Sequence, residues 1–187
     1  NATLMPGDIR YLDHDGNGML TEADKIYVDN LTYPKLSLGI ILGASWKGIR
    51  INALFQGAAD YEQRISDVYS LQSNSLPRFQ DYHVTDTWSE ENADARYPRI
   101  KFTTKADNNR LESTFWLKKC NYLRLKTLSL GYSLPQTVLK KCHLTTADIN
   151  FTAGNLFTLS SLHNMDPESL RNYPLQKTYG MSINLGF

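Results

Sequence analysis

Hydrophobic and polar residues alternate along five stretches of the chain, and a period of two residues predicts β-strands. In the clearest case Lys47-Gly48 separates two alternating runs, which predicts a hairpin. The five predicted strands cover residues 35–46, 49–57, 121–133, 146–155 and 177–187. Together they predict an all-β fold with antiparallel neighbours.

The third of these strands changes phase part-way along. Its apolar positions include Leu123 and Leu125 in the first half but Leu128, Leu130 and Tyr132 in the second half. One extra residue shifts the alternation in this way, so we expect a β-bulge near Lys126.

The length of the strands and the composition of their polar face favour a membrane barrel. The predicted strands have 9 to 13 residues, whereas a tilted strand crosses a bilayer in about 9–11 residues and soluble strands cluster near 5–6. Polar positions suited to a wet lumen are Arg50, Asn52, Gln56, Asp148 and Asn150. A soluble β-sandwich, whose apolar face would be a buried core, remains the alternative fold.

The connections between the strands alternate between short and long. In outer-membrane barrels short turns lie in the periplasm and long loops lie outside. With Phe187 in the periplasm, the turn at Lys47-Gly48 and the segment Pro135 to Thr145 are expected inside. The expected extracellular segments are residues 1–34, 58–120 and 156–176, and residues 35–187 form the barrel portion.

Five strands cannot close a barrel. An open sheet in lipid would leave two edges of unpaired backbone groups, at a cost of several kcal/mol per group. We therefore expect this chain to complete a larger wall. The chain begins with Asn1 rather than Met, which suggests that an upstream segment has been removed.

Composition narrows the function classes. A net charge of +1 over 187 residues gives no electrostatic reason to expect a nucleic-acid partner. No apolar run approaches the roughly 18 residues of a membrane-spanning helix, and no secretory leader opens the chain. Cys120 and Cys142 form no CxxC pair, and whether they form a disulfide is open.

Local motifs over nearly the whole chain resemble one transporter family. They are Pro6-Gly7-Asp8-Ile9-Arg10, Asp13 to Gly18, Pro34 to Gly39, Phe55-Gln56-Gly57, Ala95 to Arg99, Phe115-Trp116-Leu117, Tyr122 to Lys126, Leu130 to Pro135, Gly154 to Thr158, Asp166-Pro167-Glu168 and Tyr173-Pro174. In order and spacing the chain is similar to the C-terminal region of the SusC/RagA family of TonB-dependent transporters.

This resemblance implies a fold, a location and partners. The implied fold is the last five or so strands of a barrel of about 22 strands in the bacterial outer membrane. The implied partners are the N-terminal remainder of the barrel with its plug, a SusD-like surface lipoprotein, and the TonB complex through a segment not found here. The implied substrates are oligosaccharides and, in some members, peptides.

One segment has the spacing of a calcium-binding loop. Calcium is a hard cation that takes 6–8 oxygen ligands, and EF-hand-type loops supply them at fixed positions around a glycine at position 6, here Gly18. The candidate ligands are Asp13, Asp15, Asn17, Met19 through its carbonyl, Thr21 and Asp24. Asp24 replaces the usual Glu, and no incoming helix is predicted, so we expect an isolated loop with a structural Ca²⁺. The alternative is a solvated turn.

Other function classes find little support in the sequence. No GxSxG, HExxH or glycine-rich phosphate loop occurs, so we predict no catalytic residue. Glu90-Glu91 and Asp94 are candidates for a glycosidase pair or, more simply, a solvated acidic turn. The rival function is that of a secreted, soluble, calcium-dependent carbohydrate-binding β domain.

Aromatic and basic residues in the longest loop are candidates for contact with substrate or with the lipoprotein lid. They are Trp88, Tyr82, Tyr97 and Arg96. Tyr and Trp rings stack on sugars, but they equally fill the interior of a folded loop. Both interpretations are open at this stage.

Overall fold

The computed structural model describes residues 4–28, 32–65, 81–101, 108–163, 165–169 and 173–187, without the side chains of Tyr82 and Arg110. Its contacts divide the chain into two compact units. The first unit comprises Asn1–Asn30 and Arg64–Lys118, and the second comprises Leu31–Gln63 and Lys119–Phe187.

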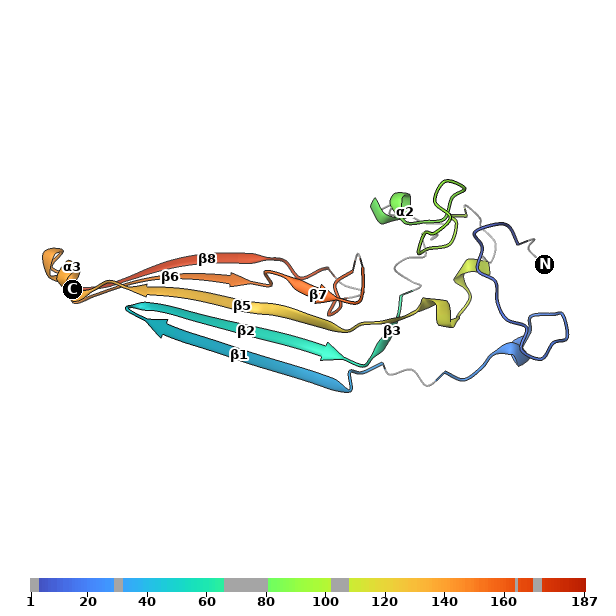
Figure 1. Cartoon of the computed structure of the whole chain (residues 1–187), viewed down its shortest axis with the longest axis horizontal. Coiled ribbons are helices and arrows are strands. Elements are labelled where there is room, and N and C mark those ends of the chain that lie inside the picture. The colour runs from blue at the N-terminus through green and yellow to red at the C-terminus, as the bar shows by residue number, and fades with distance from the viewer. Residues whose placement is uncertain (1–3, 29–31, 66–80, 102–107, 164, 170–172) are drawn as a thin grey trace. The chain divides into compact units, whose positions relative to one another are not determined.

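The second unit is built on an antiparallel sheet (Figure 1). Its long strands are β1 (Leu36–Trp46), β2 (Ile49–Ala59), β5 (Tyr122–Ser133), β6 (Thr146–Gly154) and β8 (Thr178–Gly186), adjacent in that order. Each begins and ends within two residues of the range that the alternation predicts. The short strand β7 (Thr158–Ser160) also pairs with β5, beyond the end of β6.

The register places apolar residues opposite apolar residues across all five strands. One row runs from Ala44 through Ile51, Leu130 and Phe151 to Met181, each opposite the next. Successive strand residues point to opposite faces, so this row and its equivalents form a single apolar face.

The row beside it contains small and polar residues. It runs from Gly43 through Asn52, Ser129 and Thr152 to Gly180. Rows of this kind, together with one apolar pair, Ile41 and Leu54, form the other face, which we call the polar face. The sheet therefore has two chemically different faces, as the sequence pattern predicts.

The bulge lies at the predicted residue. Leu54 is opposite Thr127 and Phe55 is opposite Leu125, so Lys126 is the residue passed over in the ladder. The extra residue keeps Leu125 and Leu128 on the same face although they are three positions apart.

The predicted hairpin is confirmed, and the backbone conformation of its turn explains why glycine occupies position 48. Lys47 and Gly48 both have positive φ, 46° and 87°, as a two-residue type I′ turn requires. A Cβ atom at Gly48 would lie 2.7 Å from the carbonyl oxygen of Ser133. Glycine is therefore needed at this position for space as well as for conformation.

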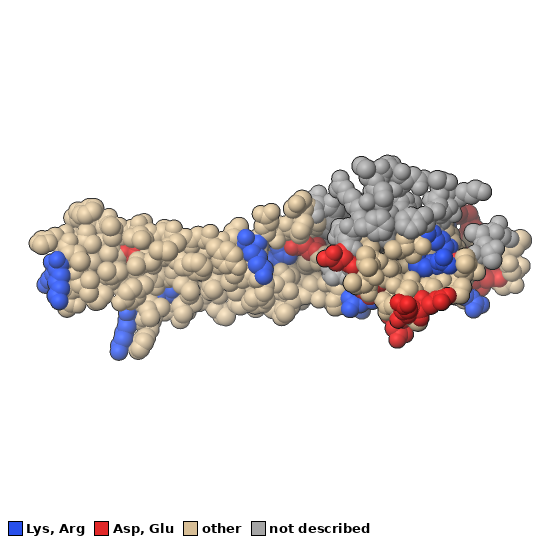
Figure 2. Space-filling view, turned by 90° about the horizontal axis from the view of Figure 1, so that it is seen from above, with Lys and Arg blue, Asp and Glu red and all other residues tan. Residues whose placement is uncertain are grey.

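The apolar face carries no second layer within the described residues. Many of its large side chains are open to the surroundings, with exposed fractions of 46% for Ile40, 69% for Met181 and 55% for Ile183. Few charged side chains interrupt the strands in the view of Figure 2. A soluble sandwich would bury such a face, and a contiguous exposed apolar face marks a partner or a membrane.

Several short elements lie outside the predicted strands. They are β3 (Glu62–Arg64) paired with β4 (Leu117–Lys119), α2 (Asp81–Thr85), α3 (Gln136–Lys141), and 3-10 turns at Glu22–Asp24, Asn108–Arg110 and Thr114–Trp116. None of the helices in the described part of the chain has the length and apolarity needed to span a bilayer. Cys120 is buried and Cys142 is exposed, and the two form no disulfide with each other.

Candidate functional site

Three carboxylates converge in the first unit. One oxygen from each of Asp13, Asp15 and Asp24 lies within 4.8 Å of the other two. Asp24 reaches them because its Oδ1 accepts the backbone N–H of His14 at 2.8 Å. The last position of the predicted loop is thus folded back onto the first, as a calcium loop requires.

Hydrogen bonds inside the loop fix this shape. The two oxygens of Asp13 accept from the backbone N–H groups of Gly16 and Gly18, each at 2.7 Å. Gly16 and Gly18 have positive φ, a conformation that glycine adopts without strain. Asn17 Oδ1 accepts from Met19 N at 2.7 Å, so the predicted ligands lie on one tightly turned segment.

Thr21 and Asp24 have a second role as a helix cap. Thr21 Oγ1 accepts from the backbone N–H of Ala23 and so caps the turn Glu22–Asp24. The backbone N–H of Thr21 donates to Asp24 Oδ2, and this bond is the main cause of the lowered pKa of Asp24. The cap holds the Asp24 carboxylate ionised and pointed at the loop.

The segment before the loop is anchored through Asp8. Its side chain is 1% exposed and pairs with Lys101 at 2.6 Å. Burial acts to raise the pKa of Asp8, but hydrogen bonds from Lys101, Met5 and Asn109 outweigh burial and lower it. Asn109 also accepts from the backbone N–H of Ile9 at 2.8 Å. The motif around Asp8 therefore holds the segment before the loop against Lys101 and Asn109.

The candidate contact residues of the long loop divide into buried and exposed groups. Tyr97 is buried, at 8% exposed, and Trp88 is half-buried, with its ring 2.4 Å from where a Cβ on Gly7 would lie. Both residues therefore pack within the first unit. Arg96 is exposed and lies 3.6 Å from Asp86. The side chain of Tyr82 lies outside the described residues. A substrate or lid contact through this loop stays a prediction.

Polar residues at the turn end of the sheet form an ion pair on the polar face. Arg50 Nη2 lies 3.0 Å from Asp148 Oδ1, and Arg50 Nη1 lies 2.5 Å from Ser133 Oγ. Ser133 also donates to Asp148. Three of the candidate lumen positions, Asn52, Asn150 and Gln56, lie on the same face by register, and the two asparagine side chains lie over glycines of neighbouring strands.

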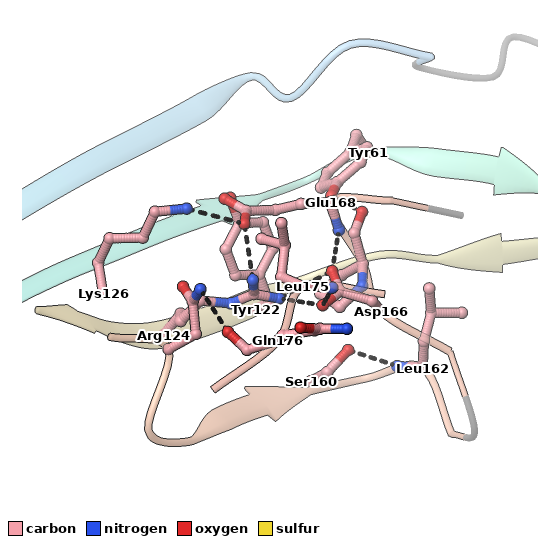
Figure 3. A network of polar contacts seen from close by, with 12 residues as sticks. Tyr61, Tyr122, Arg124, Lys126, Ser160, Leu162, Asp166, Glu168, Leu175 and Gln176 are labelled. Atoms are coloured by element: carbon pink, nitrogen blue, oxygen red, sulfur yellow. Dashed lines mark hydrogen bonds and ion pairs between the residues drawn. The ribbon is translucent and has the colours of Figure 1, made fainter. Parts of the chain in front are cut away.

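A larger network lies at the opposite end of the polar face, in the second unit (Figure 3). Arg124 of β5 is 1% exposed, and its Nη2 lies 2.8 Å from each carboxylate oxygen of Asp166. Its Nη1 lies 2.9 Å from Glu168 Oε2. A buried guanidinium is thus matched by two carboxylates from the segment that follows β7.

Two neighbours complete the network around Glu168. Tyr122 donates its hydroxyl to Glu168 Oε1 at 2.7 Å, and Lys126, the bulge residue, lies 3.4 Å from Oε2. Tyr61 donates to the carbonyl oxygen of Pro167. The formal charges of Arg124, Lys126, Asp166 and Glu168 cancel.

Asp166 also organises its own segment. Its carboxylate accepts the backbone N–H groups of Glu168 at 2.9 Å and Leu175 at 3.3 Å. Burial acts to raise the pKa of Asp166, but hydrogen bonds from Arg124 and Glu168 outweigh it, and the pKa is lowered. We call this set the Arg124 network: Tyr61, Tyr122, Arg124, Lys126, Asp166 and Glu168.

Comparisons with known proteins agree with the sequence resemblance. No protein-family model matches the chain. TonB-dependent receptor P3 of Formosa agariphila is 28% identical over 199 residues, which cover 97% of this chain and 19% of the receptor. TonB-dependent receptor P26 of the same organism is 22% identical over 200 residues, which cover 97% of this chain and 20% of that receptor.

Solved structures agree as well. The RagAB peptide transporter aligns with a TM-score of 0.64 and 27% identity over 86% of this chain and 18% of that chain. The RagAB peptide importer in its closed-closed state aligns with a TM-score of 0.67 and 26% identity over 94% of this chain and 20% of that chain.

The chain is similar to TonB-dependent receptors over nearly its whole length, and its structural neighbours are RagAB transporters, in which RagA is SusC-like. It spans about one-fifth of the length of the relatives that it matches. As in those SusC/RagA-like neighbours, its fold is an antiparallel all-β sheet of the transporter-barrel type.

Proposed function

We propose that the chain supplies the last five strands of a transmembrane barrel of roughly 22 strands in a bacterial outer membrane. The observation that carries this proposal is the register of the sheet. On the apolar face, residues lie opposite apolar residues or glycine on the next strand, and many of its large side chains are exposed. Strands of 9 to 12 residues suit a tilted crossing.

We infer that the whole protein imports oligosaccharides or peptides with energy from the TonB complex. The names of the curated relatives support the dependence on TonB, and the titles of the solved relatives support peptides as one substrate class. The plug and the segment that contacts TonB would lie in parts of the protein outside this sequence.

We infer that the partner at the extracellular side is a SusD-like lipoprotein. The SusC/RagA-like relationship and the two-component RagAB structures support this pairing. Residues 1–34, 58–120 and 156–176 would then face outward, and Lys47-Gly48, α3 and the C-terminus would face the periplasm. The alternation of short and long connections supports this orientation.

The carboxylate loop would hold a structural Ca²⁺. Asp13, Asp15 and Asp24 already converge, and Asn17, the Met19 carbonyl and Thr21 are the remaining candidate ligands. Three carboxylates this close repel one another, and a divalent cation relieves that repulsion. Because every candidate ligand is used to close the loop, the ion would stabilise the outer loop and perform no chemistry.

A gene deletion in the native bacterium tests the import function. Cells lacking the gene that encodes this chain should lose uptake of some oligosaccharides or peptides, and restoring the gene should return it. Uptake should also stop when TonB is removed. Cells that retain all such uptake after the deletion would contradict the proposed function.

A further inference from the structure

A cavity of about 720 Å³ lies in the second unit, between the polar face and the segment held by the Arg124 network. We call it the wall cavity. Gly39 and Gln56, which are opposite each other on β1 and β2, contribute to its floor. Tyr33 lies on one side, and Pro167 to Ser169 form the other.

The wall cavity has no unpaired charge among the described residues that line it. Glu168 is the single Asp, Glu, Lys, Arg or His among them. Its carboxylate already lies 2.9 Å from Arg124 and 3.4 Å from Lys126, and it accepts the Tyr122 hydroxyl. A charged ligand group placed here would lose water without gaining a partner, which is unfavourable.

Polar groups that can bind an uncharged ligand remain. The side-chain amide of Gln56 is half-buried and makes no hydrogen bond to the described part of the chain, and it can both donate and accept. Ser169 Oγ is buried without a hydrogen-bond partner among the same residues. Tyr33 is 84% exposed, so its ring is available for stacking.

The floor of the cavity leaves room beside Gln56. A Cβ built on Gly39 would meet no atom within 4 Å, so the space over this glycine is open. Because Gly39 has an ordinary strand conformation, a side chain added there would project into the cavity without backbone strain. The absence of a side chain at Gly39 therefore keeps the cavity open.

We propose that the wall cavity binds an uncharged stretch of the imported molecule through its hydroxyl or amide groups, with Gln56 as the main hydrogen-bonding residue. Arg124 is a positioning residue, since it holds Pro167 to Ser169 as one side of the cavity. This inference rests on the proposed import function. Neutral oligosaccharides and neutral peptide segments share the required chemistry.

The test compares side chains added at two positions of β1. Gly39→Phe fills the cavity, whereas Ile41→Phe, two residues along the same face, enlarges a side chain that is already 77% exposed and lies outside the lining. Each full-length variant is expressed in the native bacterium. Cells receive a mixture of neutral and acidic oligosaccharides, or a mixture of neutral and acidic peptides, and mass spectrometry measures what is taken up.

The expected result is selective. Wild-type cells take up neutral components, or components with a neutral stretch, from either the oligosaccharide mixture or the peptide mixture. The mixture from which they take up these components shows whether the ligand is an oligosaccharide or a peptide. Gly39→Phe lowers this uptake by roughly tenfold or more, while Ile41→Phe stays within about twofold of wild type.

Gln56→Leu provides a second test that adds no bulk. Loss of one hydrogen bond should raise the half-saturating concentration by roughly fivefold. Surface abundance and heat-modifiable gel mobility verify that each variant assembles. If Gly39→Phe does not assemble, the half-saturating concentration of Gln56→Leu alone tests the cavity proposal.

Failures of the two proposals are distinguishable. Uptake that is independent of TonB in wild-type cells contradicts the import function itself. TonB-dependent uptake of fully charged components, or unchanged uptake in assembled Gly39→Phe and Gln56→Leu cells, leaves the import function intact and overturns the cavity proposal.

Discussion

Arg124 and Asp166 are separated by 42 positions in the sequence, yet one guanidinium nitrogen lies 2.8 Å from both oxygens of the carboxylate. Both side chains are largely withdrawn from water, at 1% and 11% exposed. Ion pairs at this depth are sensitive to the loss of one partner, because the remaining charge stays buried. We therefore expect the pair to hold the segment after β7 against the polar face.

Replacing Arg124 should release this segment. In Arg124→Met the carboxylates of Asp166 and Glu168 lose their shared cation, and local stability should fall by about 3–5 kcal/mol. The backbone amides of Glu168 and Leu175, which donate to Asp166, report this as faster hydrogen exchange.

The matched control for that variant is Arg50→Met, which removes an arginine from an ion pair that is 44% and 31% exposed. An exposed pair contributes about 0–1 kcal/mol, so exchange at Glu168 and Leu175 should not change. Equal exchange in wild type and assembled Arg124→Met would show that the network does not hold the segment.

Acid should loosen the same segment. The pKa of Asp166 in the folded protein lies below its ordinary value of 3.8, because hydrogen bonds from Arg124 and Glu168 outweigh burial. The stability that this carboxylate contributes is therefore present above pH 3.8 and is lost as the pH falls through the lowered folded value.

A spin label can follow this transition. The label is attached to His163→Cys, three positions before Asp166, in a Cys142→Ser background, and its mobility should increase as the pH falls. In Asp166→Asn the label should already be mobile at pH 7, and its mobility should no longer respond to acid. A label that stays immobile in both proteins at all pH values contradicts the role of Asp166.

Calcium should order residues 13–24. Addition of Ca²⁺ should protect this loop from proteolysis, with a dissociation constant of about 10⁻⁴–10⁻³ M, as in extracellular calcium modules. Asp15→Ala should weaken the effect by roughly tenfold. The control is Glu22→Ala, since Glu22 is acidic but pairs with Lys25. Identical proteolysis with Ca²⁺ and with chelator would exclude a calcium role.

The bulge makes Lys126 a special site for deletion. Without Lys126, Leu125 and Leu128 become two positions apart and still share the apolar face. Deletion of Ser129 instead turns half of β5 over and places polar groups in lipid. We expect the first deletion to yield a heat-modifiable barrel and the second to abolish it. Assembly of both deletions would contradict the register.

The sequence predicts the strands well because their alternation is local and every second residue meets the same surroundings. The phase change around Lys126 even locates the bulge. The Arg124 network cannot be predicted in this way. Arg124 and Asp166, and likewise Lys126 and Glu168, lie 42 positions apart, and no local period links them. The packing of Tyr97 and Trp88 is likewise decided by tertiary contacts, although the sequence leaves that alternative open.

The most direct test asks what touches the two faces of β6. Spin labels are attached to cysteines that replace, one at a time, Asp148, Ile149, Asn150, Phe151 and Thr152 in the full-length Cys142→Ser protein in lipid, where Cys120 is buried. Oxygen from the bilayer or a nickel complex from water relaxes these labels. Oxygen should relax the labels at positions 149 and 151, whereas the labels at positions 148, 150 and 152 should be shielded from lipid. Labels at Ile149 and Phe151 that are shielded from both reagents would place these residues in a protein core and contradict the barrel.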